Sequence, residues 1–159
     1  MNVEDAIETA LFASAIDIAT FDAAHKAWPN ASFDPPADAY MRVDHLPNGS
    51  QRLSIKSVNP HLYFGILQIT VVAPLNVGVT AARQLAAEIA DAYPADRTMT
   101  QWGTTVRVEK APDVGRGFAG DAKWNVVVSI PYQSLALPGL ILSLDFTKPR
   151  NSQYLPFLS

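Results

Sequence analysis

A glycine-rich segment is the first place in this sequence where binding chemistry could be expected. Residues Gly115 to Gly120 match the pattern G-x-G-x-x-G, which in dinucleotide-binding domains brings backbone N–H groups against a pyrophosphate. That chemistry requires a strand before the motif and a helix after it. Here Pro112 lies just before the motif, and a segment with strand-like alternation follows it. The sequence therefore predicts a flexible hairpin loop at this position, and no cofactor.

The other residue types that catalyse reactions or bind metals are scattered along the chain. His25, His45 and His61 lack the spacing that places ligands on one face, so they are predicted to be surface or edge residues. The chain has no cysteine and no G-x-S-x-G elbow. Pairs of aspartates lie beside proline turns, where aspartate commonly bonds the local backbone: Asp34 with Asp38, and Asp91 with Asp96. We expect no catalytic residue, no metal site and no enzymatic activity.

The C-terminal segment is rich in apolar residues and poor in charge. On an isolated subunit such a segment would promote aggregation, so it predicts a surface that meets a partner. Folding back onto the same subunit is the alternative. We expect one domain over residues 1–132, followed by an interaction arm over residues 133–159. The predicted contact residues of the arm are Leu140, Leu142, Leu144, Phe146, Tyr154, Leu155, Phe157 and Leu158.

Trp28 is a further candidate contact residue. It lies in an extended segment bounded by prolines, next to Pro29 and before Pro35 and Pro36. Tryptophan is enriched both over sheet edges and in subunit interfaces. Both interpretations stay open from the sequence.

The elements that must position these residues follow from apolar periodicity. Helical spacing from Val3 to Ala15 and from Thr80 to Tyr93 predicts two amphipathic helices. Alternation predicts strands over residues 40–46, 62–73, 104–109 and 123–131, with a turn at Pro47 to Ser50 and a strand possible at 140–146. The predicted fold class is α+β: a mainly antiparallel sheet of about four to five strands with two helices on one face.

Composition narrows the functional classes. The chain has 159 residues, of which 48% are hydrophobic and 17% charged, as expected for a globular domain. Its net charge is −3 and it has no basic run, which argues against tight binding of nucleic acid. No apolar run approaches the roughly 20 residues that span a bilayer, so no membrane association is expected.

Short motifs in the first part of the chain resemble one protein family. The motifs are Ala27-Trp28-Pro29-Asn30, then Phe33 and Pro35-Pro36, then Tyr40-Met41-Arg42-Val43 with Leu46-Pro47, and finally Gly65-Ile66-Leu67-Gln68. In this order they resemble the tail-terminator, or tail-completion, proteins of long-tailed bacteriophages. The resemblance spans residues 3–132 and leaves residues 133–159 without a counterpart.

The resemblance implies a structural virion protein without catalytic residues or cofactors. Such an α+β subunit would form a ring, usually a hexamer, at the head-proximal end of the tail tube, after assembly in the host cytoplasm. The ring would end tube polymerisation and present a docking surface to the head. The implied partners are further copies of the chain, the major tail tube protein and a head-completion or neck protein, with DNA passing through without specific binding. The alternatives are a head–tail joining protein and, in another class, a small-molecule-binding domain or an enzyme using the loops around Gly115 to Gly120.

Overall fold

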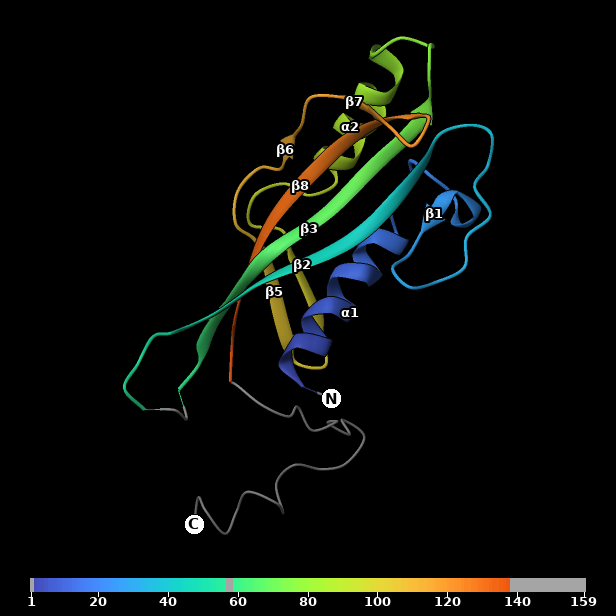
Figure 1. The fold of residues 1–159 in the computed structure, drawn as a ribbon. Helices are drawn as coiled ribbons and strands as arrows, with labels where there is room; N and C mark the ends of the chain where they lie inside the picture. Colours follow the sequence, from blue (N-terminus) through green and yellow to red (C-terminus); the bar gives the residue numbers. More distant parts are fainter. Residues whose placement is uncertain (1, 57–58, 138–159) are drawn as a thin grey trace.

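The fold is an elongated, strongly twisted sheet with two α-helices (Figure 1). The computed structural model describes residues 2–56 and 59–137. The helical elements are α1 (Val3–Ile16), the short 3-10 helix η1 (Ala23–His25) and α2 (Thr80–Asp91). The strands are β1 (Lys26–Ala27), β2 (Tyr40–Arg52), β3 (His61–Pro74), β4 (Thr98–Gln101), β5 (Thr104–Val108), β6 (Asp113–Val114), β7 (Phe118–Gly120) and β8 (Lys123–Ala136).

Three long strands form the centre of the sheet. The order is β1-β2-β3-β8-β5-β4, and β6 and β7 also pair with β8. All pairs are antiparallel except β1 with β2. β3 is paired with β8 from His61 opposite Ala136 to Pro74 opposite Lys123. Because β5, β6 and β7 occupy successive parts of the other edge of β8, the sheet curls into a half-barrel (Figure 1).

Both helices contribute to one hydrophobic core on one face of the sheet. On β3, Leu67, Ile69 and Val71 are fully buried there. At the start of α1 the side chain of Asn2 accepts the N–H of Asp5 at 2.9 Å, which satisfies one of the free helix donors. The buried helix residues are Val3, Ala6, Ile7, Ala10, Leu11, Ser14 and Ala15 from α1, and Ala82, Ala86 and Ile89 from α2.

Within residues 2–56 and 59–137 the sheet already has eight strands, so the predicted number of four to five is wrong. The four predicted strands correspond to β2, β3, β5 and β8. The others, β1, β4, β6 and β7, are two to four residues long. Such segments are too short to show a period of two. β1, β6 and β7 form along the edge of a long strand, and β4 forms along β5. The prediction of a mainly antiparallel sheet with two helices is confirmed.

The turn predicted at Pro47 to Ser50 is also wrong, because β2 continues through it to Arg52. The register with β3 shifts between Pro47 and Ser50, where Gly49 adopts a φ of +100°. β1 covers β2 only at Met41 and Arg42, so Pro47 lies where β2 is an edge strand and a missing N–H is tolerated. The turn chemistry of this segment produces a bulge instead of a chain reversal.

The predicted loop at Gly115 to Gly120 contains a strand of its own. β7 pairs with the start of β8, and β6 pairs further along the same edge. The first half of the glycine motif thus connects β6 to β7, and its second half is β7, the first strand of a β-hairpin with β8, whereas a dinucleotide fingerprint opens a helix.

β8 continues past the predicted end at Pro131 and reaches Ala136. The predicted contact residues of the arm, from Leu140 to Leu158, lie outside the described residues. None of the helices in the described ranges has the length and apolar character needed to cross a bilayer.

Candidate assembly surfaces

The hairpin of β2 and β3 projects beyond the helices (Figure 1). The hairpin tip comprises residues 53–56, where Ile55 is 93% exposed and Leu53 is 54% exposed. Arg52 shapes it: its Nε donates to the carbonyl of Ser54 at 2.7 Å, and its Nη2 donates to the carbonyl of Ile55. Both acceptors are backbone carbonyls, so these bonds bring no negative charge to the tip, which also contains Lys56. The tip is apolar and basic.

A pocket of about 300 Å³ lies between the first turns of α1 and the half of the same hairpin that is nearer its tip. Its walls are largely apolar, and the exposed residue Glu4 is one of its lining residues. We call it the acidic pocket. It is lined by Glu4, Ile7, His45, Pro47, Gly49, Ser50, Tyr63, Phe64 and Tyr132.

A chain of polar contacts runs along one side of the acidic pocket. His45 Nδ1 lies 3.0 Å from the Oε2 of Glu8 on α1, and His45 Nε2 lies 2.6 Å from the hydroxyl of Tyr132 on β8. Burial, followed by the nearby charges of Glu8 and Glu4, raises the pKa of Tyr132, so its hydroxyl stays protonated and can donate to His45. Donation from Nδ1 to Glu8 then satisfies all three groups. We call this chain the His45 network; it ties α1, β2 and β8 together.

Little in the sequence indicates the His45 network. It predicted a surface or edge histidine, and His45 does lie on a strand near the sheet edge, but its side chain is only 5% exposed. Its partners come from 37 residues before it and 87 residues after it. One signal in the sequence did point to such a contact. It is Gly65 on β3, which lies between β2 with His45 and β8 with Tyr132, because glycine inside a strand often marks the close approach of another group.

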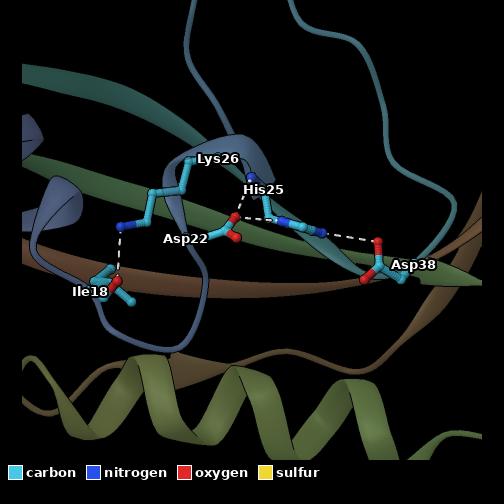
Figure 2. A network of polar contacts seen from close by, with 5 residues as sticks. All are labelled: Ile18, Asp22, His25, Lys26 and Asp38. Carbon is cyan, nitrogen blue, oxygen red and sulfur yellow. Dashed lines mark hydrogen bonds and ion pairs between the residues drawn. The ribbon is translucent and has the colours of Figure 1, made fainter.

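A second polar network holds the segment before β2 (Figure 2). His25 Nδ1 lies 2.5 Å from Asp22 Oδ1, and His25 Nε2 lies 3.0 Å from Asp38 Oδ1. Hydrogen bonding to Asp22, and then to Asp38, raises the pKa of His25, while the pKa of Asp22 is lowered chiefly by His25. Because His25 ends η1 and Asp38 nearly adjoins β2, this clamp joins the two ends of the loop 28–39.

Lys26 completes this region (Figure 2). Its side chain is buried, and its Nζ donates to the carbonyl of Ile16 at 2.6 Å and to that of Ile18 at 2.8 Å. Burial lowers the pKa of Lys26. The ammonium thus satisfies carbonyls at and just after the C-terminus of α1, where helix carbonyls lack partners within the helix.

The opposite end of the long strands carries another exposed apolar group. Leu75, Val77 and Val79, between β3 and α2, are 36%, 61% and 57% exposed. Nearby, a pocket of about 280 Å³ is lined by Val79, Arg83, Arg116, Gly117, Trp124 and Val126.

The packing around Trp124 explains one of the motif glycines. A Cβ on Gly117 would lie 2.5 Å from the Trp124 ring, so only glycine fits there. The requirement comes from packing against a side chain of β8. No ligand is needed to account for it.

Trp28 is half-buried and packs against the core. Its ring lies 5.5 Å from that of Phe12 on α1. Residues 2–56 and 59–137 contain no cluster of three or more His, Cys, Asp or Glu side chains that could hold a metal. The remaining predicted contact residues are outside the described ranges, so the arm stays a prediction.

Exposed apolar side chains at both ends of a small subunit are typical of a protein that assembles with partners. The chain belongs to a phage tail terminator family: a family model described as phage tail terminator protein matches residues 2–132. The protein is therefore a structural component of a phage tail.

Solved structures share this fold. One, whose title is only a sequence identifier, is 30% identical with a TM-score of 0.63 and covers 86% of this chain and 96% of that chain. Another, titled as the virion of a native gene transfer agent particle, is 13% identical with a TM-score of 0.58 and covers 84% of this chain and 97% of that chain. At that identity the second likeness concerns the fold alone. The comparison with curated proteins gave no match.

Proposed function

We propose that this protein forms a ring, most simply a hexamer, at the head-proximal end of the phage tail tube. The ring ends polymerisation of the major tail tube protein and gives the head-completion or neck protein a surface to dock on. The family match over residues 2–132 carries the proposal. Assembly takes place in the host cytoplasm before the tail joins the head.

The distribution of exposed apolar residues supports a ring. A ring is built from heterologous contacts, in which one surface of a subunit meets a different surface of the next. The hairpin tip and the group around Val77 lie at opposite ends of the long strands, so a subunit can meet its neighbour through the tip while the Val77 group stays free for a different partner. A net charge of −3 also suits a ring through which DNA passes without adhering, because like charges repel.

We propose that residues 133–159 form an interaction arm that extends the domain over residues 1–132 and contacts a neighbouring subunit or an adjacent virion protein. The proposed contacts are Leu140, Leu142, Leu144, Phe146, Tyr154, Leu155, Phe157 and Leu158. Trp28 is proposed as a contact at the edge of the same interface, using the part of its ring that Phe12 leaves uncovered. Replacing Leu142 and Phe146 by serine should weaken assembly, whereas replacing Lys148 and Arg150 by serine, as a matched control, should not.

Deletion of the gene, followed by electron microscopy of the lysate, tests the proposed function. We expect separate heads and tails of abnormal or uncontrolled length, restored to normal by the gene supplied in trans. Tails of normal length that fail to join heads would instead identify a neck protein. Normal infectious particles would refute a structural role in the tail and favour a ligand-binding domain or an enzyme.

A further inference from the structure

We infer that the hairpin tip of one subunit docks into the acidic pocket of the next copy of the chain. The inference rests on the proposed ring and names the two surfaces that would make its subunit contact. It assigns a use to two of the features of the fold that the internal packing leaves open.

The hairpin tip has the properties of a segment that inserts into a pocket of a partner: an exposed apolar side chain and flanking positive charges. Ile55 is 93% exposed, which is costly for an isoleucine unless another surface covers it. Between Ser50 and Lys56 the chain carries two cations, Arg52 and Lys56, and no carboxylate. The bonds from Arg52 to the carbonyls of Ser54 and Ile55 hold the tip in one shape, so little ordering is required on binding.

The acidic pocket has the complementary chemistry. Ile7, Tyr63 and Phe64 provide apolar walls, Glu4 also lines the pocket, and Glu8 follows one turn later on the same helix. Among the residues that the structure describes, no Lys or Arg side chain lines the pocket. At about 300 Å³ it is at the lower limit of small-molecule sites, a size suited to one or two side chains of a partner. An aliphatic residue flanked by cations fits it in both shape and charge.

The tip cannot reach the pocket of its own subunit. The pocket includes Pro47 and Ser50 of β2, and the pairing of Arg52 with His61 keeps the strands extended beyond it. Leu53, the first residue after β2, is thus roughly 10 Å further along the chain than Ser50, at about 3.3 Å per residue. A contact between tip and pocket must therefore join two copies, and its repetition gives the head-to-tail arrangement of a ring or filament.

Disulfide cross-linking tests the contact directly, because the wild-type chain has no cysteine. We expect the double variant Ile55→Cys with Ser50→Cys to give, on mild oxidation of the self-associated protein, a ladder of covalent oligomers that ends at a closed ring. Each single variant should give dimers at most. As a matched control, Ile55→Cys with Val77→Cys pairs the tip with an exposed residue at the other end and should give no ladder.

Charge reversal provides a second test that does not depend on oxidation. Lys56→Glu and Glu4→Lys should each weaken self-association about twofold to fivefold, measured by sedimentation, and the double variant should recover it. Glu88→Lys, an exposed change on α2, should have no effect. Circular dichroism verifies that Glu4→Lys, in the first turn of α1, remains folded.

The outcomes separate this inference from the proposed ring. The docking would be refuted if the wild-type chain associates but the Ile55→Cys, Ser50→Cys variant gives no ladder. It would also be refuted if the double charge reversal fails to recover the self-association that each single reversal weakens. Either result would leave a ring built through other surfaces. A wild-type chain that stays monomeric at every concentration and gives no ladder would count against both.

Discussion

The hydroxyl of Tyr132 lies 2.6 Å from Nε2 of His45, although β3 separates the strands that carry them. Tyr132 reaches across because its partner on β3 is Gly65, which in turn faces Pro47 on β2. A Cβ on Gly65 would lie 2.6 Å from the carbonyl oxygen of Leu46 and 2.7 Å from the Tyr132 hydroxyl. The missing side chain at position 65 is thus what allows the His45 network to form.

Gly65→Ala should destabilise the protein by about 3 kcal/mol, since its methyl group would collide with a backbone carbonyl that cannot move without disturbing the sheet. Urea unfolding measures the change. Gly120→Ala is the matched control, because a Cβ there would meet other atoms at 3.4 Å or more, an ordinary contact distance. Equal losses in the two variants would contradict the steric explanation.

Tyr132→Phe should cost about 1–3 kcal/mol of unfolding free energy, because it removes the hydroxyl partner of a buried His45 nitrogen. Tyr40→Phe serves as the control, since the Tyr40 hydroxyl makes no hydrogen bond within residues 2–56 and 59–137. Tyr132→Phe should also relieve Gly65→Ala only in part, because the carbonyl of Leu46 still obstructs the new methyl group. Full relief would show that the backbone contact is unimportant.

The parts of the fold that the sequence predicted are those with long, regular apolar patterns. The spacing from Val3 to Ala15 corresponds to α1, and the alternation before Ala73 corresponds to β3, because each element buries one continuous face. The continuation of β2 through Pro47 could not be predicted, since whether such residues reverse the chain or bulge depends on the neighbouring strand. The same holds for β6 and β7, which exist only as partners of β8.

The polar networks were beyond sequence reasoning for a related reason. Metal and catalytic motifs are recognised in a sequence by the short spacing of their residues. The partners of His45 are far from it in the sequence and meet it only when the sheet forms. Asp38 meets His25 at the other end of the proline-containing loop 28–39, and the sequence of this loop has no periodic pattern from which its path could be predicted. The exposed apolar tip could not be predicted either. In the sequence Leu53 and Ile55 look like ordinary core residues, and only the folded hairpin shows that they are exposed to solvent.

The clamp at His25 should make the loop 28–39 sensitive to pH. Because Asp22 and Asp38 raise the pKa of His25, its stabilising contribution is complete below about pH 6.5, the ordinary histidine value, and is lost as pH rises through the raised pKa. Asp22 has a lowered pKa, so its contribution is present above about pH 3.9 and is lost as pH falls through that lowered value. Hydrogen exchange should therefore show the loop best protected between these limits.

An NMR titration of the His25 ring tests the cause. Asp22→Asn should return the pKa of His25 toward its ordinary value more than Asp38→Asn does, because the hydrogen bond to Asp22 is the larger influence. His25→Gln should remove the change in loop protection near neutral pH. A His25 pKa that neither aspartate substitution alters would refute the clamp.

Lys26→Met should destabilise α1 by about 1–3 kcal/mol, although methionine fills a similar apolar volume. The lysine ammonium bonds the carbonyls of Ile16 and Ile18 from a residue that is only 6% exposed, so methionine would leave these oxygens without their donor where water has poor access. Lys110→Met is the control, because Lys110 is exposed and pairs only with Asp113, a contact that solvent screens. Urea unfolding should separate the two variants clearly, and exchange at the last turn of α1 should increase only for Lys26→Met. If the methionine variant proved as stable as the wild type, burial of the lysine stem would outweigh its hydrogen bonds, and the C-terminus of α1 would need no ammonium to hold it.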